Sequence, residues 1–264
     1  MTVIEFDRIG RGEPLLLIHG TGLDRHAWDP VIGSLARHRQ LFVVDLPGHG
    51  SSPIPPREIE PTPIGYAAML SSWLDEQGLD AVELAGNSVG GWTALELAKR
   101  GRARSVVAFA PAGLWAKRDP LSAKAQIWMD HQMSRLFSPV VPYVLHSPRG
   151  RKLFMSGAFG QPANVPAAAA LHMSRAMAKT PGFDDHLRAT TRTRFMHGQN
   201  ITVPVTIVWG ERERLIPPRA RRTDELPAQT QIVVLPGCGH VPFWDAPELV
   251  IKTILAGSPS HQAR

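Results

Sequence analysis

The chain has 264 residues, of which 43% are hydrophobic, and its formal net charge is +6. That length suits one large α/β domain or a core domain with an insertion, and no apolar run reaches the ~18 residues that a membrane helix needs. The basic residues form short, scattered clusters without interleaved aromatic residues, which favours a solvated surface over a nucleic-acid site.

The cysteine content and the first residues predict the cellular compartment of the protein. A single cysteine, Cys238, excludes an internal disulfide and is typical of a reducing environment. The opening residues carry acidic charges and alternate like a strand, unlike a signal peptide. We therefore expect a cytoplasmic monomer or homodimer without a nucleic-acid or membrane partner.

Apolar, β-branched runs alternate with helical patterns along the chain, which is the signature of a mainly parallel sheet. The near-continuous apolar character of the runs predicts helices on both faces of that sheet. Strands are predicted at 14–20, 41–48, 81–88, 105–111, 203–210 and 230–237. Helices are predicted near 26–38, 64–77 and 89–100, from about 217, and from about 245.

Residues 112–200 interrupt this alternation, because they show helical patterning and no strand. The stretch is too long for an ordinary crossover connection. We therefore expect an α/β core over 1–111 and 201–264, with a helical cap over 112–200. The cap is rich in large apolar side chains that either pack the cap or line a pocket: Trp115, Trp128, Met129, Met133, Leu136, Phe137, Phe154, Met155, Phe159, Met173, Met177 and Phe183.

Ser88 is the candidate nucleophile. It lies in "GNSVG", which fits the G-x-S-x-G turn that exposes a serine hydroxyl between a strand and a helix. A serine that simply caps the helix is the alternative. The strand-like "AVELA" before it and the helical "GGWTALELAKR" after it favour the nucleophile.

His240 is the candidate base, since it lies in a glycine-bearing loop between the last predicted strand and the last predicted helix. Parallel-sheet folds place their chemistry in such loops. His19 and His49 compete with it, but each precedes a glycine in a tight turn and is predicted to be structural. No histidine pair has convincing metal-ligand spacing.

A catalytic histidine needs an acid to orient it, and "VWGERERLIPP" offers Glu213 and Glu211 after the strand at 203–210. The chain order Ser88, Glu213, His240 is that of a nucleophile, acid and base on this kind of sheet. A surface ion pair with a neighbouring arginine is the alternative for either glutamate.

The loop "HGTG" after the strand at 14–20 has little side-chain bulk, so its backbone N–H groups can face a reacting oxygen. We expect the N–H groups of Thr21 and Val89 to form the oxyanion hole, because the residue after the nucleophile contributes one donor. A plain glycine turn is the alternative.

Together, "HGTG", "DLPGHGSS", "GNSVGG", "WGERERLIP" and "GCGHVPFWDAPELV" resemble the motifs of the α/β-hydrolase superfamily, in the same order and over essentially the whole chain. The resemblance implies an α/β-hydrolase fold with a mainly parallel, eight-stranded sheet and a helical cap after the sixth strand. The extra strands would lie around "VIEF". No metal or organic cofactor is implied.

The chain departs from the superfamily pattern at the acid, where Glu213 stands in the usual aspartate position. Some members carry the acid after the sixth strand, where Asp119 is the nearby candidate. The resemblance also implies that Ser88 excludes dehalogenase and epoxide-hydrolase chemistry, which use an aspartate nucleophile. "GNSVGG" and "CGH" also resemble the motifs of hydrolases that cleave carbon–carbon bonds in ring-fission products. In those enzymes a tryptophan usually follows the catalytic histidine, whereas this chain has Val241.

We therefore expect a serine esterase that cleaves small to medium apolar carboxylic esters through an acyl-enzyme on Ser88. Carbon–carbon bond hydrolysis, acyl transfer and amide hydrolysis by the same residues are the alternatives. A ligand receptor on this fold is a third class, and it would not react with a serine-directed phosphonate.

Overall fold

A mainly parallel sheet of seven strands forms the centre of the computed structural model, which describes residues 3–115 and 121–257. The strand order is β1-β3-β2-β4-β5-β6-β7, and only β1 runs antiparallel to its neighbour. The strands are β1 Phe6–Gly10, β2 Pro14–Ile18, β3 Gln40–Val44, β4 Val82–Asn87, β5 Ala103–Phe109, β6 Val205–Gly210 and β7 Gln231–Leu235.

The central strands are apolar on both sides because each side of the sheet packs into its own core. In β2, Leu16 and Ile18 join one hydrophobic cluster, whereas Leu15 and Leu17 join the other. The edge strand β7 is less buried, and its Ile232 and Val234 are exposed. The continuous apolar runs in the sequence thus follow from burial on two faces.

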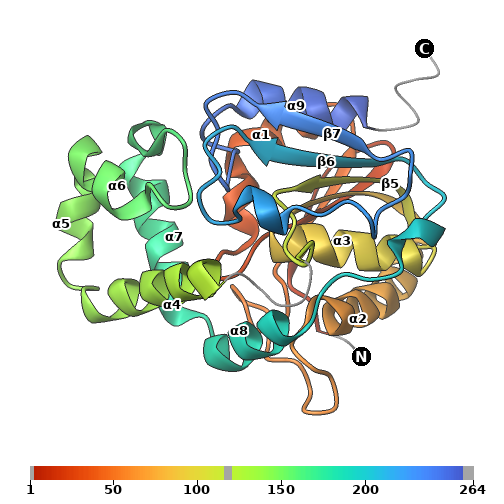
Figure 1. Ribbon diagram of the computed structural model, residues 1–264, viewed down its shortest axis with the longest axis horizontal. Coiled ribbons are helices and arrows are strands. Elements are labelled where there is room, and N and C mark those ends of the chain that lie inside the picture. Colours follow the sequence, from red (N-terminus) through yellow and green to blue (C-terminus); the bar gives the residue numbers. More distant parts are fainter. Residues whose placement is uncertain (1–2, 116–120, 258–264) are drawn as a thin grey trace.

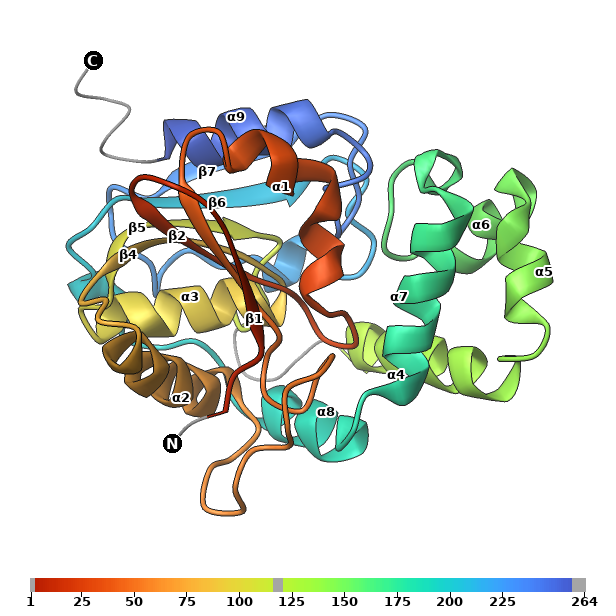
Figure 2. The same ribbon diagram turned by 180° about the vertical axis from the view of Figure 1, so that it is seen from behind.

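Helices cover both faces of the sheet, as predicted (Figures 1 and 2). α2 and α3 pack on one face, where their side chains Tyr66 and Trp92 join the first cluster. α1 and α9 pack on the other face, where Val31 and Val250 join the second cluster. The bounds are η1 Arg25–Trp28, α1 Asp29–Leu35, α2 Pro63–Glu76, α3 Val89–Lys99 and α9 Pro247–Ala256.

The segment between β5 and β6 is helical in its described part, and α4 to α7 stand to one side of the sheet (Figure 1). We propose that it forms a cap over 112–200 on a core of 1–111 and 201–264. None of the helices in the described ranges is long and apolar enough to cross a membrane. The elements are α4 Leu121–Leu136, α5 Val141–His146, α6 Pro148–Met155, η2 Pro162–Asn164, α7 Ala167–Lys179, α8 Phe183–Arg192 and η3 Gly198–Asn200.

The predicted number of strands is wrong, since the described residues contain seven rather than eight. Only Phe6 of "VIEF" belongs to a strand. Just before it, the Glu5 N–H donates to Ser52 Oγ and the Glu5 carbonyl accepts from the Asp45 N–H. Loop residues therefore use the backbone groups that would extend the ladder.

The helix predicted from about 217 is also wrong, because a single 3₁₀ turn, η4 Pro218–Ala220, stands in its place. Arg219, Arg221 and Arg222 follow so closely that helical spacing would stack like charges. Instead, Arg221 donates to the Ile216 carbonyl and Arg222 pairs with Asp224. These local bonds give Arg221 and Arg222 partners without a helix.

Candidate active site

Ser88 lies on a strained turn between β4 and α3, with φ 55° and ψ −116°. A positive φ is costly for a residue with a side chain, and such strain persists where the surrounding packing enforces it. A Cβ on Gly86 would lie 2.3 Å from the Gly90 carbonyl oxygen, and one on Gly90 would lie 2.2 Å from that of Ile18. The two glycines of "GNSVG" are therefore required by close backbone packing.

The loop that carries His240 is held from two directions. The Asn87 side-chain amide donates to the His240 carbonyl at 2.9 Å and to the Phe109 carbonyl at 3.1 Å. The Gly239 N–H donates to Asp245 Oδ2 at 2.8 Å. The residue immediately before Ser88 therefore fixes the backbone of His240.

Glu213 lies beside the buried imidazole, with Oε2 2.8 Å from His240 Nδ1. Its other oxygen accepts from the N–H groups of Leu215 at 2.7 Å and Ile216 at 3.0 Å. Burial alone would raise the pKa of Glu213, but the charge and hydrogen bond of His240 and the two backbone donors outweigh burial and lower that pKa. The carboxylate is thus ionised at neutral pH.

The hydrogen bond to Glu213 also sets the tautomer of His240. An ionised carboxylate can only accept, so Nδ1 carries the hydrogen and a neutral ring has its lone pair on Nε2. Nε2 is buried and has no hydrogen-bond partner within the described residues. It is the free proton acceptor of the site.

Glu211 does not contact His240 in the described structure. Glu211 is exposed, and its Oε2 accepts from the Gly237 N–H at 2.7 Å, so it fixes the turn after β7. Asp119 lies outside the described residues. Of the two described carboxylates, Glu213 is the one that the structure brings to the imidazole.

Thr21 and Val89 line one small cavity together with Ser88. Their backbone N–H groups have no protein acceptor within the described ranges, as expected for Val89 at the first position of α3. A Cβ on Gly20 would lie 3.2 Å from the Ser88 Cβ, so the preceding glycine allows the loop to approach the serine. The two N–H groups are free to receive an oxygen.

A buried histidine from α8 supports Thr21, and sequence reasoning missed it. His186 Nδ1 lies 3.1 Å from the Pro61 carbonyl, which can only accept, so Nδ1 is protonated and Nε2 accepts the Thr21 hydroxyl at 2.9 Å. The Tyr66 hydroxyl lies 2.9 Å from Nδ1. Burial lowers the pKa of His186 to about 4, which keeps it neutral.

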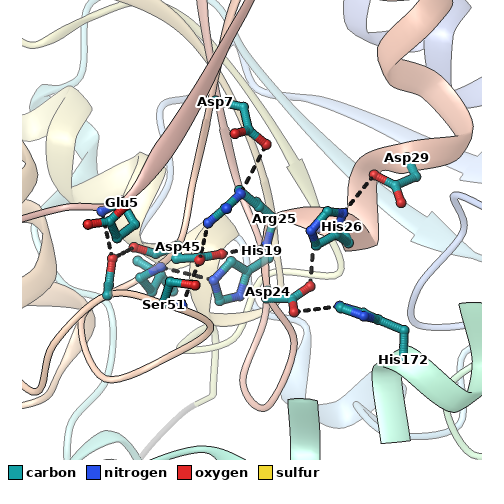
Figure 3. A network of polar contacts seen from close by, with 12 residues as sticks. Glu5, Asp7, His19, Asp24, Arg25, His26, Asp29, Asp45, Ser51 and His172 are labelled. Carbon is teal, nitrogen blue, oxygen red and sulfur yellow. Dashed lines mark hydrogen bonds and ion pairs between the residues drawn. The ribbon is translucent and has the colours of Figure 1, made fainter. Parts of the chain in front are cut away.

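A second connection joins the loop after β2 to α7 (Figure 3). His172 Nε2 lies 2.7 Å from Asp24 Oδ2, and Asp24 Oδ1 accepts from the His26 N–H. Next to it, Arg25 binds Asp7 and Asp45. Together with the contact between Thr21 and His186, this network ties α7 and α8 to the loop after β2.

The two competing histidines make structural contacts. His19 Nε2 accepts from the Leu46 N–H at 2.9 Å, and its Nδ1 lies 2.8 Å from the Gly20 carbonyl. His49 is buried with Nδ1 3.2 Å from the Pro47 carbonyl. Burial lowers the pKa of both rings, so each packs as a neutral group in its turn.

Ser88 and His240 line the same inner cavity of about 120 Å³, which lies under the helices of the segment 112–200. An outer cavity of about 650 Å³ shares Asp130, Phe154 and Leu215 with it. Only some of the large apolar side chains noted in the sequence face the inner cavity, namely Phe154, Met155, Phe159, Met173 and Met177. Four others are exposed instead: Trp128, Met129, Leu136 and Phe137.

Comparison with known proteins identifies the class. A model of the alpha/beta hydrolase family matches residues 15–253, and the chain belongs to this family. It is 33% identical over 187 residues to epoxide hydrolase EphH of Mycobacterium tuberculosis, covering 69% of this chain and 87% of that protein. The fold and enzyme class expected from the sequence are confirmed.

Two further relatives match nearly the whole chain. A pimeloyl-[acyl-carrier protein] methyl ester esterase of Nitrosospira multiformis is 27% identical over 265 residues, covering 94% of this chain and 95% of that protein. Carboxylesterase CesB from Bacillus subtilis superposes with a TM-score of 0.71 at 20% identity, covering 96% of this chain and 87% of that structure. The similarity to CesB supports the assignment of the fold.

Proposed function

We propose that this protein is a serine esterase in which Ser88 is the nucleophile, His240 the base and Glu213 the orienting acid. One observation carries the proposal. Glu213 holds Nδ1 of His240 at 2.8 Å, while the free Nε2 belongs to a residue that lines the same cavity as Ser88. A base oriented in this way beside a strained serine is the arrangement that activates a hydroxyl.

The reaction has two halves. Ser88 Oγ attacks the ester carbonyl and His240 Nε2 takes the hydroxyl proton, while the N–H groups of Thr21 and Val89 stabilise the oxyanion. The ester C–O bond then breaks, and His240 returns the proton to the leaving alcohol. Water attacks the acyl-enzyme with His240 again as base, which releases the acid and restores Ser88.

Epoxide hydrolysis, the activity in the name of EphH, does not suit a serine nucleophile. A carboxylate that opens an epoxide forms an ester, which water can cleave. A serine oxygen that opens an epoxide would form an ether, which the same residues cannot hydrolyse. Ser88 therefore favours an acyl substrate, in agreement with the names of the two esterase relatives.

The cavity supports a small or medium apolar acyl group. A closed apolar cavity of about 150 Å³ holds a molecule the size of benzene, and the inner cavity here has about 120 Å³. Phe154, Met155 and Met173 provide apolar walls. Chains that exceed the inner cavity can extend into the outer one, which shares Asp130, Phe154 and Leu215 with it.

A substrate panel tests the proposal. We expect hydrolysis of p-nitrophenyl esters from acetate upward, with kcat/KM rising about fourfold per carbon until the cavity is filled, since each buried methylene contributes about 0.8 kcal/mol. It should fall beyond that length. A ring-fission dienoate and styrene oxide complete the panel. Cleavage of either one without ester turnover would overturn the esterase assignment.

A further inference from the structure

Asp130 places a carboxylate in the wall of the otherwise mostly apolar inner cavity. Of the described residues that line this cavity, His240 is the one other residue with an ionisable side chain. Asp130 also lines the outer cavity, so it lies where the two meet. A substrate that fills the inner cavity and continues outward must pass it.

The helix α4 presents Asp130 to the cavity on one of its faces. Ile127, Asp130 and Ser134 follow one another at helical spacing and all line the inner cavity. The Ser134 hydroxyl accepts from Ser174 Oγ of α7 at 3.4 Å, and Ser174 also lines the cavity. The walls formed by α4 and α7 therefore carry three polar side chains, Asp130, Ser134 and Ser174, among apolar ones.

The Asp130 carboxylate has capacity for another partner. Gln126 Nε2 donates to Oδ1 at 2.8 Å, and no cation forms an ion pair with Asp130 in the part of the chain that the structure describes. Arg214 lines the outer cavity, but its guanidinium donates to the Ser156 carbonyl. A half-buried carboxylate with one neutral donor gains stability from a further donor or a positive charge.

The inner cavity carries the acidic Asp130, whereas the following residues 131–183 are basic. Residues 131–183 contain six lysines and arginines and no acidic residue, so their net charge is +6. The net charge of the whole chain is also +6. None of these cations lines the inner cavity. Arg151, for example, is buried against the carbonyls of Leu145 and Ala163. The basic exterior therefore does not define what the cavity accepts.

We propose that Asp130, with Ser134 and Ser174, forms a subsite for a positively charged or hydrogen-bond-donating group on the acyl chain of the substrate. The same carboxylate disfavours acyl chains that end in a carboxylate. This inference rests on the proposed esterase function, whose site it extends. It makes Asp130 a specificity-determining residue.

Matched methyl esters test this subsite: methyl hexanoate, methyl 6-(trimethylammonio)hexanoate and monomethyl adipate, with shorter and longer homologues of each. In the wild type we expect kcat/KM for the cationic ester to exceed that for the anionic one by about a hundredfold. Asp130→Asn keeps the shape and removes the charge, and should reduce this ratio at least tenfold. A change that affects all esters alike cancels in this ratio, so methyl hexanoate serves as the neutral reference in both proteins.

The control is Asp184→Asn, which makes the same change of charge at an exposed position of α8, outside both cavities. It should leave the ratio unchanged. A second measurement does not depend on turnover: calorimetric binding of hexyltrimethylammonium should weaken about tenfold in Asp130→Asn. Equal ratios and equal binding in wild type and Asp130→Asn would overturn the subsite. Failure of the wild type to cleave any ester would instead overturn the proposed function, while the binding result would still decide on Asp130.

Discussion

The Asn87 side-chain amide donates a 2.9 Å hydrogen bond to the backbone carbonyl of His240. The residue before the candidate nucleophile therefore positions the loop of the candidate base. Its second bond, to Phe109, anchors the amide to the neighbouring strand β5. The strained turn and the histidine loop thus form one rigid unit.

We expect Asn87→Ala to lower kcat about tenfold or more and to lower the free energy of unfolding by about 2 kcal/mol, because the buried His240 carbonyl loses its donor and the Phe109 carbonyl keeps only the Ser88 N–H. Ester kinetics and thermal unfolding measure the two effects. Asn164→Ala is the control, since the exposed Asn164 side chain donates to Gln161 Oε1 and no other bond of this side chain occurs in the described structure. Unchanged kcat in Asn87→Ala would show that His240 is held without this contact.

Glu213→Gln should lower kcat by about 10⁴, because an amide at this position supports the wrong imidazole tautomer. Glu211→Gln and Asp119→Asn should each change kcat less than about threefold. All three are compared with one p-nitrophenyl ester under the same conditions. Similar, mild losses in the three variants would place the acid elsewhere.

Thr21→Val should lower kcat about tenfold at nearly constant KM. The change leaves His186 Nε2 without its donor, at a cost of about 1–3 kcal/mol, and frees the backbone that presents the Thr21 N–H. Thr21→Ser keeps the hydroxyl and should restore most of the activity. If Thr21→Val and Thr21→Ser behaved alike, the hydroxyl would have no positioning role.

The preference for a cationic acyl chain should depend on pH. Burial raises the pKa of Asp130 to about 6, so its negative charge and the attraction are present above that pH and disappear below it. The neighbouring ionisable groups are His131 on α4, Arg214 at the outer cavity and His240. His240 acts on every ester, so the effect of its protonation cancels in the ratio of kcat/KM for the cationic and neutral esters.

In the wild type this ratio should therefore rise with pH through about 6, and in Asp130→Asn it should be flat. Full kcat/KM profiles for both esters supply the measurement. A wild-type ratio that does not change between pH 5 and 8 would contradict a titrating carboxylate in the subsite.

The sequence predicts those parts of the fold and candidate site whose signals are local. β4, the turn at Ser88 and α3 are contiguous, so an apolar run, two glycines and a helical pattern are enough to predict them. Glu213 and His240 follow predicted strands, and parallel strands bring such loops to one edge of the sheet.

The contacts that the sequence does not reveal join distant segments. Asn87 and His240 are 153 residues apart, and Thr21 and His186 are 165 apart. No periodicity specifies such pairs. The position of Asp130 in a cavity wall also depends on a distant segment. A polar residue within a helical pattern is predicted to face solvent, and only the packing of α7 against α4 encloses it. The helix predicted from about 217 fails for a local reason, since Arg221 and Arg222 bind partners in the loop instead.

Labelling with a fluorophosphonate, followed by intact-mass and peptide mass spectrometry, tests the central claim most directly. The wild type should gain one adduct, located on Ser88, and lose its esterase activity in proportion, whereas folded Ser88→Ala should gain none and retain less than about 1% of turnover. Adduct formation on another residue, or an active and unlabelled Ser88→Ala protein, would contradict a nucleophilic role for Ser88.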